Sequence, residues 1–449
     1  MLRLLKKLRR NERGNVLILT AAAMPLLIGS AGLAVDTIQW TLWKRQLQRA
    51  ADSAAIAGVY QRVQGADLTG VQSAVTRDLS FNQNTGIALV SGYPTVDISA
   101  DTSASTTQEV QVTLGIQKAL TFSSIFMAQA PIIVASARAA SVPGTDEYCL
   151  VSLENNAGNT GITFTGNSGV EMDCSAISNS PSSNSAVARG SSMFKAPSVA
   201  AVGGIQRSAN FQVDRYEPYV PALADPYANV SPSQADLNSK CPAGNSGNGN
   251  GNGNGNNSNT ALDENTSIPT GQTVFCYNSL SVGANRTLTL PSGTYYINGG
   301  DAFIQGNLSC TACTIVLTNK DSSATASIGQ FKVNASSNIN ISPPTGGCTL
   351  GTAGCFKGIS IYQDRRAVDS NQTNKINGNS ASRILGSVYF PKQEIDYNGT
   401  GTSDFICTRL IGRRVTFSGN SGITNKFKAD CGGSGIDAII GGRRVRLIA

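Results

Sequence analysis

The sequence predicts an α+β region followed by a large all-β domain, and three features of its 449 residues lead to this fold class. Residues 16–35 form an uncharged, apolar run of membrane-spanning length. Residues 68–142 combine a short amphipathic helix with strand-like alternation. Residues 144–449 are rich in Asn, Gly, Ser and Thr and carry many short apolar alternations, which is typical of an all-β domain.

The uncharged run is long enough to cross a bilayer. At 1.5 Å per residue, a helix from Val16 to Val35 spans about 30 Å, the thickness of the hydrocarbon core. Residues 1–14 carry six basic residues and one acid, and such a flank stays on the cytoplasmic side of a membrane. We therefore predict a cytoplasmic flank at 1–14, a transmembrane helix at 15–36, and export of the chain that follows.

Three residues agree with a permanent anchor. Pro25 lies in the middle of the run, where membrane helices tolerate proline. Trp40 and Trp43 follow the run within two turns and suit the outer membrane interface. Two alternatives stay open: a secretory signal with Gly32 and Ala34 at the −3 and −1 positions, cleaved before Val35, and a buried helix of a soluble protein.

The helix is expected to continue outward to about Gln64, because the following residues are helix formers without proline. Ala50, Ala54 and Gly58 stand four residues apart and form a face of small side chains. This face could admit a partner helix closely, or it could pack on the chain's own globular region.

The start of the chain resembles a known family. The basic flank, "RGNV", the proline-containing span, "GLAVD" and "LQRAADSAAIAGV" together resemble the N-terminal region of TadG-like (TadE/TadG) proteins of the tight-adherence (Tad/Flp) pilus machinery, over about residues 10–60. The resemblance implies an inner-membrane anchor with a pilin-like helix and a periplasmic C-terminal region that helps to assemble or tip a pilus. It implies pseudopilins and the inner-membrane platform as partners. A prepilin-peptidase substrate would carry glutamate where Leu19 stands, which favours an uncleaved anchor.

Residues 37–142 are predicted to form a pilin-like α+β region. "LTGVQSAVTRDLSFNQ", from Leu68, is typical of an amphipathic helix, and "TVDIS", "EVQVTLGIQ" and "PIIVASARAASV" are typical of strands. The D-x-S-x-S pattern at Asp101–Ser105 has the form of a von Willebrand A metal motif. Its short flanking strands favour an ordinary turn, so no metal site is predicted.

Residues 144–449 are predicted to form an irregular right-handed parallel β-helix, with a β-sandwich or jelly roll as the alternative. The phrase "TFTGNSGV" at 163–170 returns as "TFSGNSGI" at 416–423. Gly and Asn accept the positive φ that a turn between coils requires, and Asn side chains can stack in ladders. The Gly/Asn-rich segment 243–261 is predicted to be a flexible surface loop.

The ten cysteines all follow the predicted membrane span, and an oxidising compartment favours disulfides. Near-neighbour pairs such as Cys241 with Cys276 and Cys407 with Cys431 are expected. Cys310-Thr-Ala-Cys313 with Cys348 and Cys355 could also suggest a zinc site. The unequal spacing and the lack of histidine disfavour zinc.

The composition of the chain excludes several classes of function. The sequence has no histidine, which excludes Ser-His-Asp and Cys-His catalysis, and residues 1–14 carry most of the net positive charge, which leaves no basic patch for nucleic acid. Asp364, Glu394 and Asp396 could act in a β-helix carbohydrate-active enzyme, the second alternative. We predict instead a non-enzymatic assembly or adhesion protein without cofactors. An extended glycan is a possible ligand, and a secreted β-helix adhesin or glycan-binding protein is the other alternative.

Overall fold

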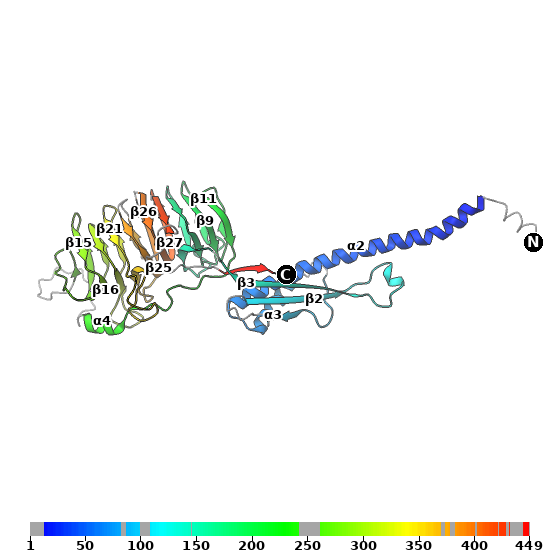
Figure 1. Ribbon diagram of the computed structural model, residues 1–449, viewed down its shortest axis with the longest axis horizontal. Helices are drawn as coiled ribbons and strands as arrows, with labels where there is room; N and C mark the ends of the chain where they lie inside the picture. The colour runs from blue at the N-terminus through cyan, green and yellow to red at the C-terminus, as the bar shows by residue number, and fades with distance from the viewer. Residues whose placement is uncertain are drawn as a thin grey trace, which may run out of the picture. The chain divides into compact units, whose positions relative to one another are not determined.

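The computed structural model describes residues 13–81, 87–98, 108–144, 146–241, 261–369, 373–377, 382–399, 402–420, 422–427, 431 and 443–448 (Figure 1). The chain divides into two compact units. Unit 1 comprises Met1–Pro143 and Arg444–Ala449, and unit 2 comprises Gly144–Arg443. The Asp101–Ser105 motif and all of the Gly/Asn-rich segment except Ala261 lie outside the described residues.

In its described residues, unit 1 has two α-helices and a four-stranded sheet. Its elements are α2 (Arg13–Val63), α3 (Leu68–Phe81), β1 (Thr95–Asp97), β2 (Gln108–Gln117), the 3-10 turn η2 (Ser123–Ile125), β3 (Ile132–Pro143) and β29 (Arg443–Leu447). The sheet order is β1-β2-β3-β29, and both β1–β2 and β2–β3 are antiparallel. Helix α2 continues through Pro25.

The last strand differs from the prediction, which ran the β-rich domain to residue 449. Arg443–Leu447 instead forms the fourth strand of the unit 1 sheet. Val445 packs against the core of unit 1 between arginines that remain at least partly accessible, so a single apolar residue aligns this edge strand. The chain therefore leaves unit 1 at Pro143 and returns to it near its C-terminus.

The core of unit 1 lies where small residues of α2 meet α3 and one face of the sheet. Alternate residues of β2 and β3 point into it, as the period of a strand requires. Its buried members are Leu47, Ala50, Ala51, Ala54, Ala55, Val59, Val71, Val75, Val110, Val112, Leu114, Ile116, Ile133, Ala135, Ala137 and Ala139. Because the α2 side chains are small, the helix lies close to its neighbours.

Unit 2 is built almost entirely from short strands. They are β4 (Tyr148–Ser152), β5 (Ile162–Phe164), β6 (Gly169–Met172), β7 (Ser175–Ser178), β8 (Ala186–Ala188), β9 (Met193–Ala201), β10 (Ile205–Gln206), β11 (Phe211–Pro218), β12 (Ala261–Leu262), β13 (Val274–Tyr277), β14 (Ser279–Val282), β15 (Thr287–Leu290), β16 (Gly293–Asn298), β17 (Ala302–Ile304), β18 (Asn307–Cys310), β19 (Cys313–Thr318), β20 (Phe331–Val333), β21 (Asn338–Ile341), β22 (Ile359–Gln363), β23 (Thr373–Ile376), β24 (Arg383–Ile384), β25 (Gly386–Gly399), β26 (Thr402–Ile406), β27 (Thr408–Gly419) and β28 (Gly422–Lys426). A short helix, α4 (Gln234–Lys240), begins at the N-cap Ser233.

Parallel pairing joins these strands into stacked rungs. Strand β13 pairs with β16, β16 with β19, and β19 with β22, while β14–β17–β20 and β15–β18–β21 run beside them. A strand thus pairs with the third strand after it. Aligned residues stack along the interior, as in Phe275 and Tyr295, whose ring centroids are 4.7 Å apart.

The order of rungs in the stack differs from the order in the chain. Strand β27 pairs with β25 on one side and with β4 and β5 on the other. Strand β28 likewise pairs with both β26 and β6. The first strands of unit 2 therefore lie in the middle of the stack, next to its last strands. In Figure 1, β9 and β11 lie on the opposite side of β27 from β25 and β26.

The repeated phrase lies at this junction. Thr163 pairs with Thr416 and Phe164 with Phe417, so the two copies occupy adjacent rungs in register. The Phe164 and Phe417 rings stack with centroids 5.2 Å apart. The side-chain amide of Asn167 donates to Oδ1 of Asn420 at 3.1 Å, which is one step of an Asn ladder. Two copies 253 residues apart in the sequence are thus neighbours in space.

The turn inside the repeat depends on glycine. Gly166 has φ +71°, and a Cβ built on it would lie 2.9 Å from the carbonyl oxygen of Gly419. Gly271 has φ +77° but no atom within 4 Å of such a Cβ. Gly271→Ala should therefore cost only the left-handed strain, about 1–2 kcal/mol. Gly166→Ala should cost more, because a rung must also shift. Urea unfolding followed by circular dichroism compares them, and equal losses would contradict the close approach.

Five disulfides connect all ten cysteines. The pairs Cys241–Cys276 and Cys407–Cys431 are both present. The remaining pairs are Cys149–Cys174, Cys310–Cys313 and Cys348–Cys355. Every pair joins cysteines that are close in sequence, and no thiolate remains for a zinc ion.

Candidate functional site

The first half of α2 presents apolar side chains that the rest of the chain leaves uncovered. Its most apolar 18-residue stretch is only 11% buried, and the helix is long and apolar enough to cross a membrane. The exposed large side chains before Asp36 are Leu19, Met24, Leu26, Leu27, Ile28, Leu33 and Val35. Exposed apolar side chains in such number are typical of a surface that contacts lipid or another protein.

The predicted anchor residues occupy this helix in two settings. Pro25 and Val35 are exposed, Val35 at 44%. Trp40 is 40% exposed, and the Lys44 ammonium lies 6.0 Å from its ring centroid. Trp43 packs against the core of unit 1, and the Lys118 ammonium lies 5.6 Å from its ring. The Val16 side chain lies outside the described part of the helix.

The small-residue face is covered by the chain itself. Ala50 and Ala54 are buried in the core of unit 1. A Cβ on Gly58 would lie 2.9 Å from Cγ1 of Val110 and 3.2 Å from Cγ1 of Val71. This face could have packed against a partner helix or against the chain's own globular region. In the structure it packs against the chain's own sheet and α3.

Comparison with known proteins singles out the same helix. Residues 14–63 match the family "Putative Flp pilus-assembly TadE/G-like". The match coincides with α2, which spans Arg13–Val63. Neither a curated protein nor a solved structure matches the chain. The TadE/G-like segment therefore comprises the uncovered apolar half of α2 together with its buried small-residue half.

Asp36, at the boundary between these halves, holds the turn that follows β2. Its carboxylate is 2% exposed and accepts hydrogen bonds from the backbone N–H groups of Phe122 and Ser123 and from the Ser123 hydroxyl, the last at 2.7 Å. One turn earlier, the Phe122 ring lies where a Cβ on Gly32 would stand. Gly32 thus makes room for an aromatic ring, a role distinct from that of a small residue at a cleavage site. The only feature of the sequence that could have indicated this role of Asp36 is its position directly after an apolar run.

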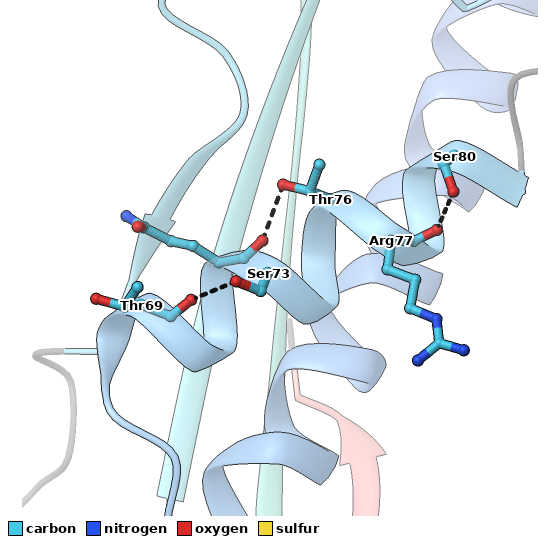
Figure 2. A pocket seen from close by; sticks show the side chains of 6 residues that line it. Thr69, Ser73, Thr76, Arg77 and Ser80 are labelled. Atoms are coloured by element: carbon cyan, nitrogen blue, oxygen red, sulfur yellow. Dashed lines mark hydrogen bonds between the residues drawn. The ribbon is translucent and has the colours of Figure 1, made fainter.

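A shallow depression on α3 offers no comparable site. Thr69, Gln72, Ser73, Thr76, Arg77 and Ser80 line it (Figure 2). The hydroxyls of Ser73, Thr76 and Ser80 donate to carbonyl oxygens of the helix itself. These three hydroxyls are therefore already satisfied within the helix, as is usual for a solvated helix face.

The three candidate catalytic carboxylates have different partners. Asp364 accepts from the Thr318 hydroxyl at 2.7 Å and from Arg366, and although burial opposes its charge, these bonds lower the pKa of Asp364. Glu394 accepts from the Thr416 hydroxyl at 2.6 Å, and Asp396 from the Ser418 hydroxyl at 3.2 Å. Burial raises the pKa of Asp396. In the parts of the chain that the structure describes, no three acidic or cysteine side chains form a metal-binding group.

A larger ionic cluster was not predicted. Glu154 is fully buried just after β4 and accepts from the guanidinium groups of Arg413 and Arg414 on β27, at 3.1 and 2.9 Å. Asp369 accepts from the same two arginines. Burial disfavours the Glu154 carboxylate, but hydrogen bonds from Arg413, from the Asn156 N–H and from Arg414 lower the pKa of Glu154 to about 2. The cluster joins the first strand of unit 2 to its last rungs.

Proposed function

We propose that this chain is a single-pass inner-membrane component of Tad/Flp pilus assembly. Residues 1–14 remain in the cytoplasm, residues 15–36 cross the membrane, and both folded parts lie in the periplasm. The observation that carries the proposal is the coincidence of the TadE/G-like match with a helix whose first half leaves its apolar surface uncovered. The basic flank favours this orientation, and five disulfides suit an oxidising compartment.

In this proposal unit 1 is a pilin-like head and unit 2 an irregular parallel β-helix. A long helix packed on an antiparallel sheet supports the first assignment. Recurring parallel pairing between each strand and the third strand after it supports the second. A stack of parallel strands is suited to binding an extended partner. We take this partner to be a pilus component such as a pseudopilin or the membrane platform, with a glycan as a further ligand.

We further propose that the chain acts by assembly and not by catalysis. The Asp364 carboxylate is paired with Arg366, and the Glu394 carboxylate is bonded to Thr416 and Arg414. A glycosidase requires two carboxyl groups that face one bond from a cleft. Replacement of Asp364, Glu394 and Asp396 by the corresponding amides should leave pilus formation intact, which a catalytic role would not allow.

The deciding experiment combines intact mass with topology. We expect protein purified from membranes of the native host to have the full-length mass, and externally added protease to digest unit 2 in spheroplasts. A chain that lacks residues 1–34 and is released into the soluble fraction would instead establish a secreted binder.

A functional test completes the design. Deletion of the chain should abolish surface pili, and the wild-type chain should restore them. A version whose residues 1–36 are replaced by a cleavable signal should reach the periplasm without restoring pili. Normal piliation in the deletion strain would contradict the proposed role in assembly.

A further inference from the structure

The turn between β2 and β3 carries a second uncovered apolar surface in unit 1. Ile125, Phe126 and Met127 are 72%, 84% and 44% exposed at its tip. Ile132 and Val134, at the start of β3, are also exposed. Residues 119–137 carry no charged side chain, and Lys118 and Arg138 bracket this uncharged stretch. Three consecutive large apolar side chains at a loop tip are unusual for a surface in water.

The tip lies beside the apolar half of α2. Asp36 accepts from the Phe122 and Ser123 N–H groups, and the Phe122 ring packs at Gly32. Figure 1 shows the β2–β3 hairpin extending along α2 in this direction. Gly32 is four residues inside the span, which corresponds to a depth of about 6 Å along the helix axis. Apolar groups of interfacial elements are buried to about this depth, 5–10 Å.

The backbone N–H groups of the tip form their hydrogen bonds within the protein, so the tip can enter an environment without water. The N–H groups of Phe122 and Ser123 donate to Asp36. The next four donate within the turn: Ser124 to the Leu120 carbonyl, Ile125 to that of Phe122, and both Phe126 and Met127 to that of Ser123. The Ser124 hydroxyl donates to the Thr121 carbonyl. Six consecutive backbone donors are thus satisfied internally, which lipid requires and water does not.

We propose that the tip, residues 121–130, inserts Ile125, Phe126 and Met127 into the leaflet from which α2 emerges on the exported side. The inference rests on the membrane anchor proposed above and adds a second contact to it. A helix alone can rotate and tilt in a bilayer, whereas a helix with a hairpin fixed to it at Asp36 has one orientation. The tip would therefore set the angle at which unit 1 stands on the membrane.

A fluorescence experiment tests this placement on the full-length protein. All native cysteines are disulfide-bonded, so one introduced cysteine is the site for a thiol-reactive, environment-sensitive dye. Four single variants are labelled: Phe126→Cys and Ile125→Cys at the tip, Leu27→Cys in the exposed part of α2, and Thr76→Cys on the exposed face of α3. Each is reconstituted in vesicles of phosphatidylethanolamine and phosphatidylglycerol, with or without a lipid that carries a nitroxide quencher on its acyl chain.

We expect the dye at 126 and at 125 to emit at shorter wavelength and to lose fluorescence to the nitroxide, as the dye at 27 does, while the dye at 76 is unaffected. Quenching at 27 with none at 125 and 126 overturns the tip insertion and leaves the anchor standing. This second outcome is the one expected of a tip that binds a partner protein, which these vesicles lack, and does not enter lipid. Absence of quenching at all four positions overturns the anchor itself and the tip insertion with it.

Discussion

Replacement of Phe164 by alanine is expected to lower the free energy of unfolding of unit 2 by about 3–5 kcal/mol. The Phe164 ring is fully buried between two others, with its centroid 4.4 Å from that of Phe194 and 5.2 Å from that of Phe417. It joins the first strands of unit 2 to the last ones. Alanine leaves a cavity that the adjoining rungs cannot close, because their backbones are held in register by parallel pairing.

The measurement is urea unfolding of the full-length protein in detergent, followed by far-UV circular dichroism. Phe303→Ala is the matched control, since Phe303 lies on β17 with 40% of its surface exposed. It should change the free energy by well under the Phe164 value, near the ~0.5 kcal/mol typical of surface positions. Comparable losses in the two variants would show that the junction does not depend on its ring stack.

Glu154→Gln is expected to lower the free energy of unfolding by about 3 kcal/mol at neutral pH, as the loss of one partner from a buried ion pair does. The substitution keeps the shape of the side chain but leaves Arg413 and Arg414 with one fewer buried negative charge. Asp369 still pairs with both arginines, which holds the loss at the lower end of the usual range.

The effect should depend on pH in a defined direction. The pKa of Glu154 falls from 4.5 to about 2 on folding, so its stabilisation is complete above pH 4.5 and is lost as the pH falls toward 2. The difference between wild type and Glu154→Gln should therefore shrink across this window. Glu171→Gln removes a carboxylate from an exposed pair with Lys195 and should have little effect at any pH. A pH-independent difference between wild type and Glu154→Gln would contradict a charge-based role.

Periodicity in the sequence was sufficient to predict α2, β2 and β3 of unit 1. The uncharged run and the small residues that follow it predicted a helix to about Gln64, and α2 ends at Val63. "EVQVTLGIQ" and "PIIVASARAASV" predicted β2 and β3, because alternation reports which side chains face a core. The same logic could not assign Arg443–Leu447 to this sheet, since an edge strand with one inward valine has almost no alternation.

Contacts between segments that are distant in the sequence could not be predicted from it. The repeated "GNSG" phrase predicted a turn between coils, but nothing in its residues says that the two copies are neighbours. Nothing in the sequence marks Asp36 or Glu154 as a buried acid, and only the fold brings Ser123 to one and Arg413 to the other. A buried acid is defined by its partners, and a single sequence gives no distances between them.

The order of rungs in unit 2 has a consequence for how the chain is made. Synthesis delivers β4, β5 and β6 long before β27 and β28, the strands that complete their sheet on one side. Until the last rungs arrive, one edge of these strands has main-chain donors and acceptors without their final partners. In a chain truncated before β27, this edge would stay without its partner strands. The C-terminal segment is therefore needed to complete the pairing of the strands with which unit 2 begins.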